Sequence, residues 1–391
     1  MDLIPRTMAP KLRSLAKKFP IISVMGPRQA GKSTLVKSTF PHLRYLSLES
    51  PDTREFALSD PRGFLLDLEK GAILDEVQRA PELFSYLQEA VDAQGGMGKF
   101  ILTGSQNFLL QEKITQSLAG RVGILKLLPF SLRELTSGDL APKEPESLLT
   151  DGCYPPLHVR KIAAGDWYSA YVQTYLEKDV RQMKNISDLN SFHRFLRFCA
   201  ARHGQILNLT SLANDSGLAV NTIKSWISIL EASFILFLLK PYHQNLGKRL
   251  IKSPKLYFTD PGLAAYLMGI ETVEQVKTHA LKGALFEGLI LSDFLKERYA
   301  AGRESNLYYW RDIPGHEIDC ILEHGGHASA VEIKSGKTIA PDYFGGLKKW
   351  AELSGTPATR CHLVYGGKEN QKREAGRVWS WIWAGEINQD P

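Results

Sequence analysis

The chain has 391 residues, of which 43% are hydrophobic and 23% are charged. These values are ordinary for a soluble globular protein, and the length is sufficient for two or three domains with hydrophobic cores. The net charge of +6 is a mild basic bias, which permits contact with nucleic acid but does not by itself indicate it.

The cysteines, the N-terminal segment and the longest apolar run exclude several classes of protein. Cys153, Cys199, Cys320 and Cys361 lie far apart without a C-x-x-C pair, which argues against a zinc site or a disulfide framework. The basic N-terminus lacks the apolar core of a secretory signal, and the longest apolar run, 234–239, is too short to cross a bilayer. We therefore expect a cytoplasmic protein with no membrane partner.

The chain begins with an expected amphipathic helix at 6–19 and a strand at 21–25, and the most specific motif follows at once. This motif consists of Gly26, Pro27, Arg28, Gln29, Ala30, Gly31, Lys32 and Ser33. It fits G-x-x-x-x-G-K-[ST], the P-loop pattern, and no helix breaker follows it until Pro41. Strand, glycine loop and helix is the order that the pattern requires, so we expect Gly26 to Thr34 to bind a nucleoside triphosphate.

The residue types of this motif suit phosphate binding. Glycines allow backbone N–H groups to surround a phosphate, and the following helix directs the positive end of its dipole at the same anion. In this pattern Lys32 reaches the β- and γ-phosphates, and the Ser33 hydroxyl binds Mg²⁺.

A second acidic motif follows an expected strand at 44–48 and an expected helix at 58–70. Residues 71–76 form an apolar run that ends in Asp75 and Glu76, which is the Walker B arrangement. We expect Asp75 to hold Mg²⁺ and Glu76 to act as the general base that deprotonates the attacking water. The alternative is a solvated strand end.

The next elements complete an α/β pattern. A helix is expected at 81–94, a strand at 99–102 and a further strand at 123–127. Ser105 belongs to a polar segment, 103–107, that is expected beside the γ-phosphate or, alternatively, as the cap of the following helix. Because strands and helices alternate, we expect a parallel sheet covered on both faces.

Several motifs together resemble one family. They are GPRQAGKS (26–33), ILDEVQ (73–78), ILTGSQNF (101–108), LAGRV (118–122), LPFSLREL (128–135) and GCYPP (152–156). In this order they are similar to the AAA-type ATPases of bacteria and archaea that carry a C-terminal domain of unknown function. The resemblance implies an AAA+ ATPase that uses ATP and Mg²⁺, and no guanine-reading N-K-x-D stretch is present.

The resemblance also assigns a candidate role to one arginine. Arg121 matches the arginine of the LAGR motif, which implies an arginine finger or sensor. Supplied by a neighbouring subunit of a homo-oligomer, it would stabilise charge on the transferring phosphoryl group. The alternative is a surface salt bridge.

The middle of the chain contains a helix-turn-helix pattern. A linker is expected at 142–146, helices at 166–180 and 191–203, and two further helices at 211–216 and 220–230 with Gly217 in the turn. Strands at 234–239 and 255–258 would form a wing. The side chains that would face a DNA groove are Asn221, Thr222, Lys224 and Ser225. DNA binding and a packing or assembly role both remain open, because this helix carries a single cation.

The last segment has the element order helix, three strands, helix, strand. The expected elements span 283–299, 307–310, 316–322, 328–334, 342–353 and 362–365. With Glu287, Asp319, Glu332 and Lys334, this order resembles the PD-(D/E)xK restriction-endonuclease-like fold, although Ile318 stands where a proline is usual. The resemblance implies one or two divalent cations on Asp319 and Glu332, a Lys334 that positions water, and an assisting Glu287. An inactive domain of the same fold is the alternative.

The sequence therefore predicts an α/β P-loop ATPase domain at 1–140. A helical and winged-helix region at 150–275 and an α/β nuclease-like domain at 276–391 follow it. The expected function is ATP hydrolysis with Mg²⁺, coupled to the C-terminal module. Two alternatives remain: an ATP-gated, metal-dependent nuclease that acts on DNA or RNA, and a nucleotide-stabilised, non-catalytic regulatory or scaffold protein.

Overall fold

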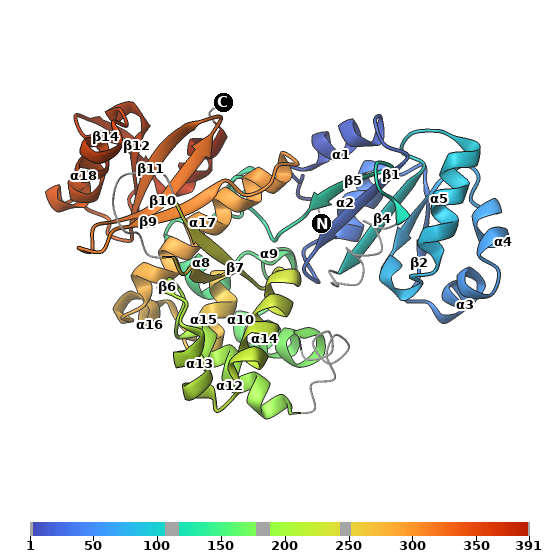
Figure 1. The fold of residues 1–391 in the computed structure, drawn as a ribbon, viewed down its shortest axis with the longest axis horizontal. Helices are drawn as coiled ribbons and strands as arrows, with labels where there is room; N and C mark the ends of the chain where they lie inside the picture. The colour runs from blue at the N-terminus through green and yellow to red at the C-terminus, as the bar shows by residue number, and fades with distance from the viewer. Residues whose placement is uncertain (1–2, 106–116, 177–187, 243–251, 390–391) are drawn as a thin grey trace.

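The computed structural model describes residues 3–105, 117–176, 188–242 and 252–389 (Figure 1). Within these ranges, no helix combines the length and the apolar character needed to cross a bilayer. The predicted polar segment at 103–107 is described only as far as Ser105, and the helix predicted at 166–180 is described only to residue 176.

The N-terminal domain is built on a five-stranded parallel sheet in the order β2-β3-β4-β1-β5. Its strands are β1 (Ile21–Gly26), β2 (Arg44–Ser47), β3 (Ala72–Asp75), β4 (Phe100–Ser105) and β5 (Val122–Lys126). Strands β1, β3 and β4 are buried along their whole length, because helices cover both faces of the sheet. The predicted parallel, doubly covered sheet is confirmed.

Two groups of helices cover this sheet. The helices are α1 (Ala9–Ala16), α2 (Lys32–Thr39), α3 (Pro51–Ser59), α4 (Pro61–Leu66), η1 (Val77–Arg79) and α5 (Leu83–Gln94). On one face α1 and α2 pack Leu12, Leu35 and Val36 against β1, while on the other face α3, α4 and α5 pack around Phe64 and Leu87. The carboxyl ends of the strands thus share one edge, where the P-loop lies.

A helical region with three short strands follows. Its helices are α7 (Leu132–Ser137), α8 (Pro145–Asp151), α9 (Pro155–Val159), α10 (Ala164–Tyr171), the π-helical turn η2 (Val172–Leu176), α12 (Leu189–Ala200), α13 (Leu209–Ser216), α14 (Val220–Ala232), α15 (Pro261–Leu267) and α16 (Val273–Thr278). Its strands are β6 (Gln205–Ile206), β7 (Leu236–Pro241) and β8 (Lys255–Phe258). β8 pairs antiparallel with both β6 and β7.

Two glutamates of the segment predicted as a linker, 142–146, form ion pairs with other parts of the protein. Helix α8 already begins at Pro145, and the Glu146 carboxylate is buried and contacts the Lys282 ammonium at 2.8 Å. Glu144 pairs with Lys337 and Lys368 of the C-terminal domain. A proline- and charge-rich composition suggested a solvated linker, but the charges here have specific partners, so the segment is anchored.

The C-terminal segment adds a long helix and six strands. The elements are α17 (Lys282–Ala300), β9 (Leu307–Arg311), β10 (Glu317–His324), β11 (His327–Lys334), η3 (Pro341–Phe344), α18 (Gly345–Ser354), η4 (Ala358–Arg360), β12 (Cys361–Tyr365), β13 (Gln371–Arg373), β14 (Gly376–Ser380) and η5 (Trp381–Gln389). Strand β7 pairs in parallel with β9, which gives one nine-stranded sheet in the order β13-β14-β12-β11-β10-β9-β7-β8-β6. The segments predicted as 150–275 and 276–391 therefore share a sheet and a hydrophobic core.

Helix α17 connects this second unit to the ATPase domain, as its course in Figure 1 shows. The Asp293 carboxylate accepts the Leu132 N–H at 2.7 Å, and the Lys296 ammonium donates to the Phe130 carbonyl at 2.9 Å. Ala300, at the end of α17, packs with the core of the N-terminal domain. Helix α17 thus holds the segment between β5 and α7 through buried polar groups, and its last residue reaches the core of the N-terminal domain.

Candidate functional site

The P-loop backbone adopts conformations that favour glycine at two positions. Gly31 immediately precedes α2 with φ of +94°, and Gly26 has φ of +154°. A Cβ atom on Gly26 would lie 1.9 Å from the Leu127 carbonyl oxygen, so a side chain there would displace β5 from β1. The loop is therefore shaped by close backbone approach, as a phosphate-binding glycine loop requires.

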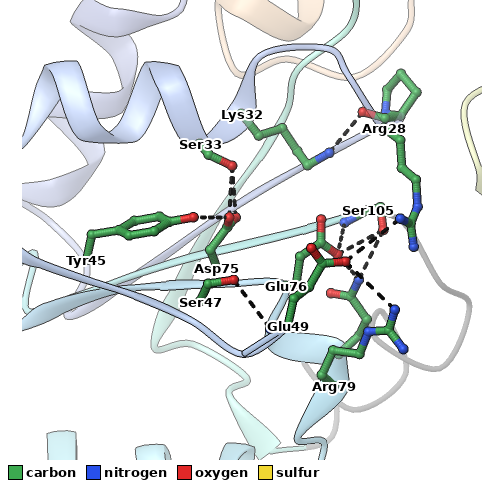
Figure 2. A network of polar contacts seen from close by, with 12 residues as sticks. Arg28, Lys32, Ser33, Tyr45, Ser47, Glu49, Asp75, Glu76, Arg79 and Ser105 are labelled. Carbon is green, nitrogen blue, oxygen red and sulfur yellow. Dashed lines mark hydrogen bonds and ion pairs between the residues drawn. The ribbon is translucent and has the colours of Figure 1, made fainter. Parts of the chain in front are cut away.

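Lys32 and Ser33 begin α2, and Ser33 faces Asp75 at the end of β3 (Figure 2). The Lys32 ammonium donates to the carbonyl oxygens of Gly26 at 3.0 Å and Pro27 at 2.9 Å. The Ser33 hydroxyl donates to the two oxygens of Asp75 at 3.1 and 3.0 Å. A cation, a hydroxyl and a carboxylate thus converge beside the glycine loop, as the sequence predicted.

Two further hydroxyls orient Asp75. The Tyr45 hydroxyl, from β2, donates to Asp75 Oδ2 at 2.5 Å, and the Thr103 hydroxyl, from β4, donates to Oδ1. Partial burial, together with the hydrogen bond to Asp75, raises the pKa of Tyr45, so this residue remains a donor. Sequence analysis did not assign a role to Tyr45 or Thr103, since only the strand order brings them beside Asp75.

Glu76 lies next to Asp75 but belongs to a separate group of contacts (Figure 2). Its backbone is left-handed, with φ of +55°, an unfavourable conformation for a non-glycine residue. Its carboxylate accepts hydrogen bonds from the Ser105 hydroxyl at 3.0 Å and from the Gln78 amide. Ser105 therefore lies beside the candidate base, at the end of β4, and Gln78 is a contact that sequence analysis missed.

Arg6 connects the P-loop to the start of α7. Its guanidinium donates to the carbonyl oxygens of Ala30 and Leu128, both at 2.6 Å, and lies 3.0 Å from a Glu134 oxygen. Glu134 also completes a capping box with Ser131 at the N-terminus of α7. No local pattern predicted this role for Arg6, because its partners lie in two distant parts of the chain, at residue 30 and at residues 128–134.

These groups surround one pocket of about 600 Å³, a volume within the usual range for small-molecule sites. The polar side of the pocket contains Gly31, Lys32, Ser33, Thr34, Asp75, Glu76, Arg28 and Gln29. Its other walls come from the N-terminal segment and from α9, namely Leu3, Ile4, Pro5, Ala9, Pro155, Pro156, Val159 and Arg160. The pocket thus lies where the ATPase domain meets the helical region.

The donor set beside this pocket fits Mg²⁺. A serine hydroxyl and a carboxylate lie within 3.1 Å of each other, both present oxygen atoms, and both face the same pocket. Magnesium prefers oxygen ligands and keeps several waters when it is bound with a nucleotide, so few protein ligands are required. Ser33 and Asp75 are therefore the residues that would hold it.

Arg121 lies away from this pocket. It immediately precedes β5, and its carbonyl accepts the Ile21 N–H at the amino edge of the sheet, opposite the P-loop. Its guanidinium forms a bidentate pair with Asp92 of α5, at 2.6 and 2.9 Å. A role within its own chain's nucleotide site does not fit this position, because the P-loop follows β1 at the other edge. A role in a neighbouring subunit's site stays a prediction.

The helix-turn-helix residues divide into two sets. Asn221 and Lys224 are exposed on α14, whereas Thr222 and Ser225 are half-buried. Ile223 and Trp226 pack inward against α12 and α13. A partner of this helix would therefore meet Asn221 and Lys224 first.

The four C-terminal candidates, three acids and Lys334, also lie together, and a second lysine lies among them. The Lys334 ammonium contacts Asp319 Oδ2 at 3.2 Å and Glu332 Oε2 at 2.7 Å. Glu287 of α17 faces Lys255 of β8 at 3.3 Å and accepts a hydrogen bond from the Tyr257 hydroxyl. Lys255 is a cation that sequence analysis did not include.

Burial and charge shift the pKa values of this cluster in opposite directions. Burial raises the pKa of Glu287 to about 7, and burial together with Asp319 raises the pKa of Glu332 to about 9. Burial would also raise the pKa of Asp319, but Lys334 and Lys255 outweigh it and hold that pKa below its usual range. Asp319 is therefore the permanently ionised member, stabilised by both ammonium groups.

Three family profiles match successive parts of the chain. Residues 18–136 match an AAA domain, residues 143–274 match a domain of unknown function (DUF8612), and residues 282–383 match a second domain of unknown function (DUF4143).

Two solved structures illustrate the fold similarity. The Walker-type ATPase PABY2304 of Pyrococcus abyssi is 18% identical, with a TM-score of 0.46 over 68% of this chain and 99% of that one. The AMPPCP-bound DnaA of Aquifex aeolicus is 12% identical, with a TM-score of 0.28 over 57% of this chain and 85% of that one.

Two curated relatives extend the similarity over nearly the whole chain. They are the uncharacterized proteins Rv2008c of Mycobacterium tuberculosis and Mb2031c of Mycobacterium bovis. Each is 30% identical over 369 residues, which cover 93% of this chain and 80% of the relative. The chain therefore belongs to the family of these mycobacterial proteins, and it joins an AAA-type P-loop ATPase domain to a DUF4143 C-terminal domain.

Proposed function

We propose that this protein hydrolyses ATP with Mg²⁺ at the P-loop pocket. The observation that carries the proposal is the convergence of Lys32, Ser33, Asp75 and Glu76 on one pocket at the carboxyl edge of the parallel sheet. Three separate elements, α2, β3 and the turn after β3, supply these groups. Their residue types match the cation, metal-binding hydroxyl, metal-binding carboxylate and base that phosphoryl transfer requires.

Each residue has a distinct role in this proposal. Lys32 exchanges its contacts with the Gly26 and Pro27 carbonyls for the β- and γ-phosphates. Mg²⁺, held by Ser33 and Asp75, would neutralise charge on the phosphate oxygens. Glu76 accepts the proton of the attacking water, and Ser105 and Gln78 set the orientation of its carboxylate.

The opposite side of the pocket suits the base of the nucleotide. Its walls include Leu3, Ile4, Pro155, Pro156 and Val159, which are apolar side chains from the N-terminal segment and α9. An apolar slot next to a phosphate cradle is a usual arrangement for nucleotide sites. The preference for adenine over guanine is part of the proposal and rests on the lack of a guanine-reading motif.

Phosphate release from ATP tests this proposal. Lys32→Ala should abolish ATP binding or turnover, whereas Lys18→Ala, a matched change of an exposed lysine, should retain wild-type turnover. Unchanged phosphate release by the Lys32→Ala variant would remove the assignment. Tight ATP binding with negligible hydrolysis by the wild type would instead identify a nucleotide-stabilised scaffold.

We further propose that a neighbouring subunit supplies Arg121 to the nucleotide site. Its support is the position of the residue at the edge opposite its own P-loop, on a surface that a second subunit can approach. Neither Arg121→Ala nor Lys32→Ala should hydrolyse ATP alone. A mixture of the two should regain part of the activity, because each Lys32→Ala subunit supplies Arg121 to an intact P-loop. A mixture as inactive as its components would contradict the proposal.

A second candidate function is DNA binding by the helical region. Its support is the order α12, β6, α13, α14, β7, β8, with β8 between β6 and β7, which is similar to that of a winged helix-turn-helix, and the exposure of Asn221 and Lys224 on α14. Fluorescence anisotropy with duplex DNA tests it. Lys224→Ala should weaken binding and reduce its salt dependence, whereas Lys277→Ala on α16 should not. Stimulation of ATP hydrolysis by the same DNA would couple the two units.

A further inference from the structure

The C-terminal cluster lies where the PD-(D/E)xK resemblance predicts a divalent metal. The observed order α17, β9, β10, β11, α18, β12 matches the predicted order of helix, three strands, helix and strand. The resemblance therefore makes a specific expectation about Glu287, Asp319 and Glu332, namely that their oxygens are free to bind a metal ion.

Each of these carboxylates instead faces an ammonium group. Lys255 is only 5% exposed and contacts Glu287 at 3.3 Å, and it also pairs with Glu317 of β10. Lys334 contacts both Asp319 and Glu332. Two lysines thus already occupy positions beside the acidic groups of the cluster.

The arrangement of oxygens does not fit a divalent ion. In the part of the chain that the structure describes, no three Asp, Glu, His or Cys side chains converge at one point that could hold a metal. One oxygen of Asp319 also accepts the Ile333 N–H at 2.7 Å. On the side of α18, the Glu332 carboxylate packs so closely on Gly346 that a Cβ atom there would lie 2.1 Å from its oxygen. A divalent ion on Asp319 and Glu332 would have to displace the Lys334 ammonium and compete with these contacts.

We propose that Lys255 is the permanent cation of this cluster, and that the cluster takes no divalent metal. It is an ion-pair junction that fastens β8 to α17 and β10, and the C-terminal domain is a binding module without a metal-dependent nuclease centre. Lys255 comes from the helical region, so the junction joins two segments that are distant in sequence.

The position of β8 gives this junction a structural consequence. Lys255 begins the strand, and Asp260 follows its end. The Asp260 carboxylate accepts the Cys153 N–H at 2.7 Å and a hydrogen bond from the Tyr168 hydroxyl at 2.5 Å. Cys153 lies two residues before Pro155, which lines the nucleotide pocket. The start of β8 is thus held by the C-terminal cluster. Beyond the end of β8, Asp260 holds the segment that leads to the pocket.

Binding of Mn²⁺ to the nucleotide-free full-length protein tests the first part of the proposal. Electron paramagnetic resonance of free Mn²⁺ should give the same titration curve for the wild type and for Asp319→Asn. A site present in the wild type and absent from Asp319→Asn would overturn the proposal. No ATP is used, so a failure of the proposed ATPase function would leave this result unchanged.

Thermal unfolding tests the role of Lys255. Lys255→Met should lower the melting temperature by several degrees more than Lys252→Met, a matched change of an exposed lysine three residues earlier. Adding Glu287→Gln to Lys255→Met should restore part of the loss, because the carboxylate that lost its partner is then neutral. Equal melting temperatures for Lys255→Met and Lys252→Met would overturn the proposal, and so would a double variant no more stable than Lys255→Met. If Lys255→Met does not fold, recovery of folded protein in the double variant is the supporting result.

Discussion

The protein contains two groups of lysines and carboxylates that are built from similar residues and differ in access. Around the P-loop, Lys32 contacts backbone carbonyls, and Asp75 and Glu76 face a pocket of about 600 Å³. In the C-terminal cluster, Lys255 and Lys334 contact the carboxylates directly. The first arrangement leaves charges available to a ligand, and the second satisfies them internally.

This difference shows why residue type alone does not identify a reaction centre. A buried carboxylate without a cation is costly, and a paired one is a structural element. At the P-loop site, hydroxyls of Ser33, Tyr45 and Thr103 hold Asp75, and hydroxyls leave its negative charge in place for a metal. At the C-terminal cluster, the ammonium groups of Lys334 and Lys255 compensate the charge of Asp319.

The largest expected effect comes from making the same Glu→Gln substitution in each of the two groups. Glu76→Gln should lower kcat for ATP hydrolysis by roughly 10²- to 10⁴-fold while ATP remains bound, because the amide cannot accept the proton of water. Glu332→Gln in the C-terminal cluster should keep the wild-type kcat. Single-turnover hydrolysis and nucleotide binding, measured on both variants, check this. Rapid turnover by Glu76→Gln would reassign the base.

The P-loop site also depends on a neighbouring side chain, that of Arg6. Arg6→Ala removes two hydrogen bonds to the carbonyls of Ala30 and Leu128 and leaves the buried Glu134 carboxylate without its cation. We expect a loss of about 2–4 kcal/mol in the free energy of unfolding, with ATP binding at least about tenfold weaker. Chemical denaturation and nucleotide titration measure the two effects. Arg62→Ala, at an exposed ion pair, is the control and should change neither.

The C-terminal cluster should affect how the stability of the protein depends on pH. The folded-state pKa of Glu332, about 9, lies above its ordinary value of 4.5, because burial and Asp319 disfavour the ionised form. Its contribution to the free energy of unfolding is therefore full below about pH 4.5 and is lost as the pH rises toward 9.

Glu332→Gln is neutral at every pH and separates this contribution from others. It should be close to the wild type near pH 5 and more stable by several kcal/mol near pH 9. Thermal unfolding of both proteins across this range measures the difference. A difference that stays constant from pH 5 to 9 would show that the carboxyl keeps an ordinary pKa.

Local patterns in the sequence predicted the elements of the first site well. Residues 21–33 combine a buried strand with a glycine loop, and residues 71–76 combine an apolar run with two acids. Each motif can therefore be recognised from the residues directly around it. Because the carboxyl ends of parallel strands share one edge, the two motifs lie close together in the structure. Each of these inferences uses contacts that are close in sequence or follow from strand order.

The partners that complete both groups were not predictable in the same way. Arg6 meets Leu128 from a distance of 122 residues, and Lys255 meets Glu287 from a distance of 32. An isolated arginine in the first residues and a lysine at the start of β8 have no periodicity that indicates a partner. Only the packing of α17 and β8 reveals whether the acids near the C-terminus are free or paired.

The smallest expected effect comes from Tyr45, and it tests how Asp75 is oriented at the P-loop site. Its hydroxyl donates to Asp75 Oδ2 at 2.5 Å, and the Lys37 ammonium lies over its ring at 3.4 Å. Tyr45→Phe keeps the ring and this cation contact but removes the donor, so Asp75 loses one of three hydroxyls that orient it. One hydrogen bond to a charged group corresponds to about 1–2 kcal/mol.

We therefore expect the Mg²⁺ concentration for half-maximal ATP hydrolysis to rise roughly five- to thirtyfold in Tyr45→Phe, with kcat at saturating Mg²⁺ close to wild type. The result distinguishes orientation of a metal ligand from a general loss of structure, which would lower kcat at every Mg²⁺ concentration. Tyr86→Phe, on the outer helix α5, is the matched control. A variant whose kcat falls while its Mg²⁺ dependence is unchanged would show that Tyr45 acts on the chemical step and does not set the position of Asp75.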